Sequence, residues 1–414
     1  MSKYTIREVK TAADRRKFLT MAVDLYKGDP NWVQPWDHDI ESVFDPAKNK
    51  QFQGGEAVRW ILTDDDSGKV VGRIAAFYNR ESAAAEEVPT GGCGFFECID
   101  DHQAADMLFD AARDWLAARG MEAMDGSVNF GDRLFWWGVL VEGFEQPIYT
   151  MNYNHPYYGQ LFEEYGFQNY FNQYSFLRRF DPDIVMDQVF IKSQRLFENP
   201  DYSFECVDMK RLPEMAENFR KVYNSAWADF PGVKPLTSEH AREMMNALKP
   251  IIDPEVLYFA YYQGEPVGFF IMIPDINPIV KLMRGKFGLW QKLKFMYHLK
   301  VKRTPNRLSG LIFGVDAEFQ GRGVESGLIR MFEMYVDSRR EKGTTVYQNL
   351  DMAWVGDFNP LMIRLCEQQI KAVKYKRHVT YRYLFDRERP FKRAPLLRRK
   401  KNTDATAVPP PAGE

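Results

Sequence analysis

A glycine loop in the second half of the chain has the residue types and spacing to hold a diphosphate. It follows an apolar run that ends at Val315, and apolar side chains recur at helical intervals after it. Glycine lets the backbone come close to a ligand, and the unpaired N–H groups at a helix start attract negative charge. The contacts expected with such a ligand involve Gln320, Gly321, Arg322, Gly323 and Val324. An ordinary turn between a strand and a helix explains the same glycines equally well.

The elements around this loop are expected twice along the chain, in the same order. In the first half we expect strands at 4–9, 57–63, 70–78, 93–99, 121–128 and 170–178, and helices at 13–26, 101–119 and 156–165. In the second half we expect strands at 204–207, 256–262, 267–273, 311–315, 345–350 and 374–385, and helices at 212–227, 324–340 and from residue 359. This repetition indicates two duplicated α/β domains.

Length and composition restrict the class of protein. A chain of 414 residues with 45% hydrophobic residues is long and apolar enough for two cores. Its net charge of −2 argues against a nucleic-acid partner. The four cysteines lack metal-ligand or disulfide spacing, so we expect no metal and a reducing compartment. Because no long apolar run is present, we expect a cytoplasmic protein, with peripheral attachment to the inner membrane as an open alternative.

The repeated order predicts where the domains begin and end. The first domain is expected at 1–180, a connector at 181–200 and the second domain at 201–388, with an insertion at 276–307. Residues 389–414 are expected to form a basic and then disordered tail, because three prolines and small residues follow Asn402.

The glycine loop resembles the cofactor-binding motif of the GNAT acyltransferases, in which Gln or Arg is followed by two residues, Gly, one residue, and Gly or Ala. Gln320 and Gly323 match this motif, whereas Glu325 stands where a small residue is usual. Longer stretches are similar to a family of bacterial double-GNAT proteins, with distant similarity to bacterial ceramide synthases, which N-acylate sphingoid bases. These stretches are GFFECID, MDGSVNFGDRLFWWGVLVEGF, MNYNHPYY, PDINPIVK, WVGDFNPLM and YKRHVTYRY.

The resemblance implies a fold and an activity. The fold is α/β, with two tandem GNAT-like domains in which a mixed, mainly antiparallel sheet is flanked by helices. The activity is that of an N-acyltransferase that uses acetyl-CoA or a longer-chain acyl-CoA, with an acyl-carrier protein as an alternative donor. Its acceptor is an amine, for which a lipid of the sphingoid-base type is one option. The first domain is expected to be degenerate, because its loop from Ile99 to Gln103 has no glycine and two carboxylates that repel phosphate.

Acyl transfer to an amine needs a base, a polarised thioester carbonyl and an acid for the thiolate. The resemblance implies that backbone N–H groups between Phe313 and Val315 polarise the carbonyl. It also implies that Asn359 bonds the cofactor arm, although a helix N-cap role explains Asn359 equally well. The tyrosine that usually protonates the thiolate is absent, because Leu365-Cys366-Glu367 stands in its place.

Several side chains are candidates for proton transfer and for acceptor binding. We take Asp351, Tyr375 and His155 as the catalytic candidates. Further conceivable groups, each of which capping, surface exposure or core packing explains as well, are Glu97, Glu142, Asp316 and Tyr381. The aromatic and amide-rich loop at 151–158 is expected to form the acceptor wall through Asn152, Tyr153, Asn154, Tyr157 and Tyr158.

A basic and aromatic segment between Asp275 and Asp316 contains no acidic residue. Its helical stretch has one apolar face, formed by Leu289, Trp290, Leu293, Met296 and Tyr297. This pattern is typical of a helix lying on an anionic membrane, with contact expected through residues 281–303. A helix packed by this face on the protein, with its lysines in water, explains the pattern equally well.

Two classes of function therefore follow from the sequence. The leading hypothesis is an acyl-CoA-dependent N-acyltransferase with both domains framing the acceptor cleft. The alternative is a non-catalytic double-GNAT scaffold or binding protein, which Glu325, Cys366 and the acidic loop at 99–103 favour.

Overall fold

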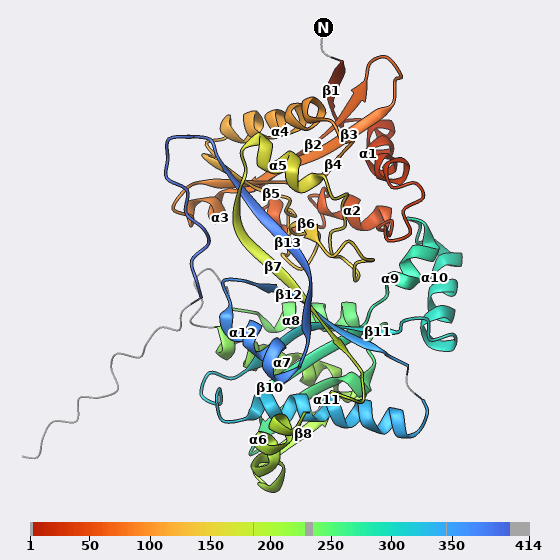
Figure 1. The fold of residues 1–414 in the computed structure, drawn as a ribbon, viewed down its shortest axis with the longest axis vertical. Coiled ribbons are helices and arrows are strands. Elements are labelled where there is room, and N and C mark those ends of the chain that lie inside the picture. The colour runs from red at the N-terminus through yellow and green to blue at the C-terminus, as the bar shows by residue number, and fades with distance from the viewer. Residues whose placement is uncertain (1–2, 185, 228–234, 345, 398–414) are drawn as a thin grey trace, which may run out of the picture.

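The computed structural model describes residues 3–184, 186–227, 235–344 and 346–397. The predicted disordered tail from Asn402 lies outside the described residues. Within them, one 13-stranded sheet runs through the molecule, and helices cover both of its faces (Figure 1). The strand order is β1-β2-β3-β4-β5-β13-β7-β12-β11-β10-β9-β8, and β6 pairs with β13 beside this row.

The strands divide between the two halves of the chain. The first half contains β1 (Tyr4–Glu8), β2 (Gly55–Asp64), β3 (Val70–Asn79), β4 (Thr90–Cys98), β5 (Ala123–Gly126), β6 (Val139–Glu142) and β7 (Gln168–Arg179). The second half contains β8 (Tyr202–Cys206), β9 (Leu257–Tyr262), β10 (Glu265–Pro274), β11 (Arg307–Val315), β12 (Asn349–Gly356) and β13 (Val373–Leu384).

The last strands of the two halves are exchanged. β7 of the first half pairs antiparallel with β12 of the second half, where Arg178 lies opposite Leu350. β13 of the second half pairs with β5 of the first half, where Tyr381 lies opposite Gly126. Because β7 and β13 also pair with each other, two central strands join both halves into one sheet. The final strand of each half therefore lies next to strands of the other half.

Helices lie between and after these strands. The first half contains α1 (Ala12–Leu25), α2 (Asp37–Val43), α3 (Arg80–Ala84), α4 (His102–Ala117) and α5 (Tyr158–Tyr165). The second half contains α6 (Asp187–Glu198), α7 (Leu212–Trp227), α8 (Ser238–Leu248), α9 (Asn277–Val280), α10 (Leu289–Met296), α11 (Val324–Glu341) and α12 (Pro360–Arg364).

Alternation along the strands separates two cores in the first half. Ile74 and Ala76 of β3 point into the core under α4 and α5. Ala75 and Phe77 point to the opposite face, where Phe18 of α1 packs with them. Successive strand side chains point to opposite faces, so one buried strand contributes to both layers. The pocket described below lies on the α1 face.

The fold class predicted from the sequence is confirmed, as a mixed and mainly antiparallel sheet flanked by helices. The helices expected at 13–26, 101–119 and 324–340 are α1, α4 and α11. The segment expected as a connector at 181–200 contains α6, which packs on α11. Helix α2 and strand β6 were not expected from the sequence pattern.

The insertion at 276–307 folds as a helical projection at the side of the molecule, between the two halves (Figure 1). It consists of α9, a short 3₁₀ turn, α10 and a π-helical turn, η5 (Tyr297–Val301). In the ranges that the structure describes, no helix is long and apolar enough to cross a membrane.

Candidate functional site

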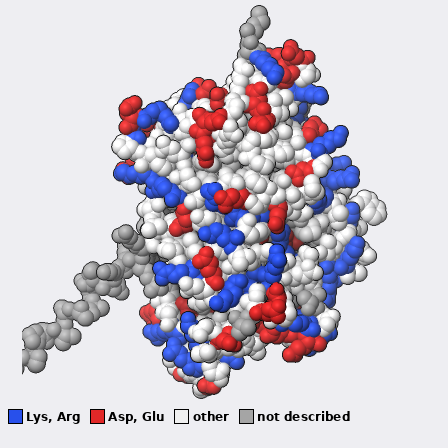
Figure 2. All heavy atoms as spheres, viewed as in Figure 1, with Lys and Arg blue, Asp and Glu red and all other residues white. Residues whose placement is uncertain are grey.

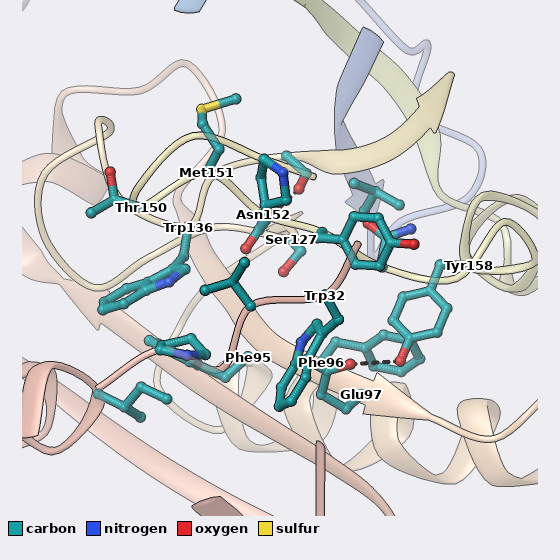
Figure 3. A pocket seen from close by; sticks show the side chains of 18 of the residues that line it. Trp32, Phe95, Phe96, Glu97, Ser127, Trp136, Thr150, Met151, Asn152 and Tyr158 are labelled. Carbon is teal, nitrogen blue, oxygen red and sulfur yellow. Dashed lines mark hydrogen bonds between the residues drawn. The ribbon is translucent and has the colours of Figure 1, made fainter. Parts of the chain in front are cut away.

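A narrow pocket with a cavity volume of about 70 Å³ opens beside the end of β4 (Figure 3). Residues 32–35 and the end of β4 form one side of it, and residues from Ser127 to Asn154 form much of the other. Asn277 of α9 also lines it, so the second half of the chain contributes to the wall. The aromatic lining includes Trp32, Phe95, Phe96, Trp136, Tyr149 and Tyr158.

The pocket exists because β4 separates from its parallel neighbour β5. The two strands pair only from Thr90 to Gly92, and one further hydrogen bond of 2.9 Å joins the N–H of Val128 to the carbonyl of Cys93. At Gly94 the two backbones touch so closely that a Cβ would lie 1.8 Å from the carbonyl oxygen of Val128. Phe95 then takes a φ of 50°, and β4 turns away from β5, which opens the pocket between them.

The carboxylate of Glu97 lies in this pocket. Its Oε2 accepts hydrogen bonds of 2.7 Å from the hydroxyls of Tyr26 and Tyr158, and its Oε1 is 3.4 Å from Nη2 of Arg73. Burial raises the pKa of Glu97, and the charge of Arg73 and the two hydroxyls oppose this shift in part. A carboxylate with a raised pKa in a pocket is suited to take up a proton near neutral pH.

The residues around Glu97 form a connected network. Tyr158 also accepts a hydrogen bond of 2.9 Å from the N–H of Cys98, which fixes its hydroxyl against β4. The ring of His155, a predicted catalytic residue, stacks on Tyr26 with ring centroids 4.5 Å apart. A positive charge on His155 lowers the pKa of Glu97. His155 therefore lies beside the network without a direct hydrogen bond to the carboxylate among the described contacts.

Most of the predicted acceptor wall lines the pocket, namely Asn152, Tyr153, Asn154 and Tyr158. Tyr157 lies next to it and donates a hydrogen bond of 2.8 Å to the carbonyl of Cys98. The amide of Asn154 makes hydrogen bonds of 2.7 and 2.9 Å to the backbone of Leu140 in β6. These contacts hold the wall in shape, and acceptor binding by it stays a prediction.

The glycine loop at 320–323 lies in the second half, between β11 and α11. Gly321 and Gly323 have φ values of 76° and 98°, a conformation that favours glycine. The N-cap residue Gly323 provides no side-chain cap for α11. At the corresponding place in the first half, by contrast, Asp101 caps α4 through a hydrogen bond of 2.9 Å from the N–H of Ala104.

Glu325 turns back onto the glycine loop. Its Oε1 accepts a hydrogen bond of 3.1 Å from the N–H of Gly321. Helix α6 also contacts the loop, because Arg195 donates a hydrogen bond of 2.9 Å to the carbonyl of Arg322. A diphosphate that bound to the N–H of Gly321 would have to displace the Glu325 carboxylate. Diphosphate binding by this loop stays a prediction.

Comparison with known proteins gives relatives over nearly the full length of the chain, although no family model matches it. The chain is 27% identical over 375 residues to the bacterial ceramide synthase of Caulobacter vibrioides (strain NA1000 / CB15N), covering 90% of this chain and 95% of that protein. It is 26% identical over 387 residues to Protein YghO of Escherichia coli (strain K12), covering 91% of this chain and 94% of that protein. A tandem GNAT protein from the clavulanic acid biosynthesis pathway has the same fold, with a TM-score of 0.51 at 11% identity, covering 92% of this chain and 98% of that one.

This chain is a tandem GNAT protein in its fold. The predicted resemblance to double-GNAT proteins is thereby confirmed. Both halves contain a strand that separates from its parallel neighbour, β4 in the first GNAT half and β11 in the second. β11 pairs with β12 only from Arg307 to Gly310, so Phe313 and Val315 lie beyond the paired part. Their role in polarising a thioester carbonyl stays a prediction.

Asn359 has the geometry of a helix cap in the second GNAT half. Its Oδ1 accepts a hydrogen bond of 3.2 Å from the N–H of Met362 in the first turn of α12. Cys366, which stands where the thiolate acid is usual, is fully buried, and burial raises its pKa to about 12. A buried thiol of this kind is inert in proton transfer near neutral pH.

The structure brings Asp351 and Tyr375 together, and neither of them lines the pocket at Glu97. The hydroxyl of Tyr375 donates to Oδ2 of Asp351. Arg307 lies 3.8 Å from Asp351 and donates two hydrogen bonds, of 3.1 and 2.7 Å, to Asp275. Asp275 in turn accepts a hydrogen bond of 3.0 Å from the N–H of Tyr149, which lines the pocket. This cluster fastens the second GNAT half to the pocket wall.

Sequence reasoning missed Arg73 and Tyr26, which both contact Glu97. Arg73 is 4% exposed and donates a hydrogen bond of 2.6 Å to the carbonyl of Phe18. A single charge inside the apolar stretch VVGRIAAF was the available signal for it. Tyr26 had no local signal, because it reaches Glu97 from the C-cap of α1 across 71 residues of sequence.

No metal centre is formed by the residues that the structure describes, since no group of three or more His, Cys, Asp or Glu is placed to hold an ion. The four cysteines are free thiols. Burial raises the pKa values of Cys93 and Cys98, so these thiols are poor nucleophiles.

Proposed function

We propose that this chain is an N-acyltransferase that transfers an acyl group from a thioester to an amine, and that the reaction takes place in the pocket at Glu97. The observation that carries the proposal is the Glu97 carboxylate, whose side chain is 12% exposed and which two tyrosine hydroxyls hold where a GNAT strand separates from its neighbour. The likeness to the bacterial ceramide synthase of Caulobacter vibrioides supports the same class of reaction.

Glu97 would act as the base in this reaction. The amine nitrogen forms the new bond to the acyl carbon, its surplus proton passes to Glu97, and the carbon–sulfur bond breaks to release a thiolate. Tyr26 and Tyr158 position the carboxylate and stabilise its charged form. The aromatic walls exclude water, which strengthens these hydrogen bonds and limits hydrolysis of the thioester.

The acyl donor is proposed to be acyl-CoA, which supplies an activated acyl group. The glycine loop follows the far end of β11, since Arg307 at the other end of this nine-residue strand contacts Pro147 of the pocket wall. The uncapped start of α11 and the charge of Arg322 suit a diphosphate there, provided that Glu325 releases Gly321. A donor bound at this loop would serve the separation of β11 from β12 rather than the pocket at Glu97. The loop at 99–103 of the first half suits it less, because Asp101 occupies an N–H group of α4. An acyl-carrier protein, whose carrier arm has one phosphate group, is the alternative donor.

The acceptor is proposed to be a lipid-like amine of the sphingoid-base type. Its supporting observations are the aromatic pocket walls and the name of the Caulobacter relative. Such a lipid resides in a membrane, so the proposal includes a cytoplasmic protein attached peripherally to the inner membrane. Residues 281–303 supply the basic and apolar side chains for that contact.

A donor and acceptor screen tests this proposal. Acetyl-CoA, palmitoyl-CoA and a palmitoyl-carrier protein are each combined with sphinganine or with a water-soluble amine, and the free thiol and the amide are measured. We expect amide formation with a long-chain amine and its loss in Glu97→Gln. If the folded protein forms no amide with any donor, the proposal is wrong.

A non-catalytic binding protein is the second candidate. The hydrogen bond from Gly321 to Glu325 favours it, as does the capping of α4 by Asp101, because both occupy N–H groups that a diphosphate would use. Thermal-shift measurements with CoA and sphinganine separate the two candidates. A binding protein gains stability with a ligand by mass action and forms no amide.

A further inference from the structure

The outer face of the helical insertion carries a row of exposed apolar side chains. Their exposed fractions are 74% for Leu289, 79% for Trp290, 56% for Leu293, 54% for Tyr297 and 71% for Val301. These positions follow one side of α10 and continue along η5. Large apolar side chains grouped in this way mark an interaction surface, whereas single ones are ordinary. We call this row the outer face.

The inner face of the same helices is already packed. Phe295 and Leu299 are 5% and 8% exposed and belong to a core cluster with Trp36. A backbone hydrogen bond of 2.9 Å from Asp37 to the carbonyl of Gly285 fixes the insertion to the first half. These contacts use only the inner face of the insertion. Packing on the protein therefore does not explain the apolar side chains of the outer face.

Positive charge surrounds the outer face. Residues 276–307 contain nine Lys and Arg and no Asp or Glu, although the whole chain has a net charge of −2. One of the nine, Arg307, belongs to the buried cluster with Asp275, which leaves eight for the insertion's surface. Lys294 contacts the carbonyl of Leu282, and Lys292 lies 5.6 Å from the ring of Phe287, so neither contact neutralises the lysine charge. Blue and white spheres cover this projection at the right of Figure 2.

We propose that the outer face docks on an anionic phospholipid bilayer. The apolar row enters the boundary between head groups and acyl chains, and the lysines contact the lipid phosphates. A protein partner fits less well, because lysines are depleted at protein–protein interfaces. The inference rests on the proposed function, because it names the bilayer as the place from which the pocket at Glu97 takes its lipid amine.

The outer face and the pocket share a supporting wall. Asn277 of α9 lines the pocket, and its Nδ2 donates a hydrogen bond of 2.8 Å to the carbonyl of Pro147. Val33 both lines the pocket and packs against the insertion. Docking through the outer face of α10 therefore holds the pocket wall one helix diameter, about 10 Å, behind the bilayer surface.

Vesicle flotation tests the docking surface with the full chain. Phosphatidylcholine vesicles with and without phosphatidylglycerol are compared, and we expect flotation that depends on the anionic lipid. Trp290→Ser with Leu293→Ser, and separately Lys292→Glu with Lys294→Glu and Lys300→Glu, should each abolish it. For the lysine variant we expect partitioning on the order of a hundredfold weaker, because each basic residue near an anionic surface contributes roughly a factor of five.

Matched substitutions elsewhere control for a general loss of apolar or basic residues. Ile191→Ser on α6 removes an apolar side chain that is 66% exposed, and Lys10→Glu with Lys48→Glu and Lys69→Glu reverses three distant charges. Both controls should float like the unchanged protein. The inference is overturned if the unchanged protein does not float or if both docking variants still float. A concentration-dependent dimer that is lost in the Trp290 variant would assign the outer face to a second copy of the chain instead.

A soluble acceptor separates failure of docking from failure of the proposed function. With a detergent-dispersed amine, the docking variants should form amide at the rate of the unchanged protein. With the same amine in anionic vesicles, their rate should fall at least tenfold. If flotation behaves as expected while no amide forms under either condition, the docking surface stands and the proposed activity is wrong.

Discussion

Glu97 and Tyr158 lie 61 residues apart, yet the hydroxyl of Tyr158 donates a hydrogen bond of 2.7 Å to the Glu97 carboxylate. The same hydroxyl accepts the N–H of Cys98, so one tyrosine joins the backbone of β4 to the carboxylate. The separation of β4 from β5 gives this pair a pocket to face.

Replacing Glu97 by Gln should remove acyl transfer and leave the fold intact. General-base catalysis contributes about 10²–10⁴-fold, so a decrease in kcat of that size is expected. Because the pKa of Glu97 is raised, activity of the unchanged protein should rise with pH as the carboxylate loses its proton. Steady-state rates between pH 5 and pH 9 measure this, and the residual rate of Glu97→Gln should lack that rise.

Glu142→Gln is the matched control for this substitution. The Glu142 side chain is 61% exposed and pairs with Arg377 at 2.6 Å. Its loss should change the rate and its pH dependence by less than a factor of two. Equal loss of activity in both variants would contradict the assignment of Glu97 as the base.

Tyr26→Phe and Tyr158→Phe should move the pH dependence of activity upward. Hydrogen bonds from both hydroxyls lower the pKa of Glu97, so removing either one raises it further. Tyr158→Phe should also cost about 1–3 kcal/mol of stability, because the N–H of Cys98 loses its acceptor. Rate profiles and urea unfolding measure the two effects. A Tyr26→Phe profile with an unchanged midpoint would argue against the network.

The sequence contains enough information for most individual elements. Apolar spacing at 105–116 places α4, and the turn at 64–68 places the β2–β3 hairpin, because both signals are local. Helix α6 was missed because the segment resembles a charged connector, and its apolar residues are recognisable only against α11.

The arrangement of the site was less accessible from the sequence. Asp351 and Tyr375 were expected as catalysts, and they contact each other in a buried ion cluster that joins the pocket wall through Asp275. Their catalytic role stays a prediction. Glu97 was one of several conceivable bases, because its raised pKa depends on Tyr26, Tyr158 and Arg73 brought together by the fold. Local patterns do not encode such long-range neighbours.

Glu325→Ala should increase the affinity for CoA if the glycine loop binds its diphosphate. The substitution frees the N–H of Gly321 and removes a negative charge from the start of α11. A gain of roughly three- to tenfold is expected from the usual size of such helix-terminus effects. Isothermal titration calorimetry measures it, with Glu318→Ala as a control that removes an exposed charge nearby. Equal gains in both variants would point to net charge alone.

Because of Lys376, the free energy of unfolding should change with pH in the alkaline range. Burial lowers the pKa of Lys376 to about 8 from an ordinary value of 10.5. At a pH between these two pKa values, Lys376 binds a proton in the unfolded chain but not in the folded chain. The free energy of unfolding therefore rises with pH through this range. The rise should be about 3 kcal/mol and should disappear in Lys376→Met. Urea unfolding at pH 7.5 and pH 10 tests this, and the exposed Lys374→Met should retain the rise.

The exchange of β7 and β13 predicts that the halves do not fold separately. A fragment of residues 1–180 lacks β12 and β13. In this fragment β5 loses its neighbour β13, and β7 loses both of its neighbours, β12 and β13. Exposed strand edges of this kind favour aggregation over folding. We expect no cooperative unfolding transition from this fragment alone, and recovery of one on coexpression with residues 181–414. A cooperative transition from residues 1–180 by themselves, measured by circular dichroism in urea, would show that the exchange is dispensable.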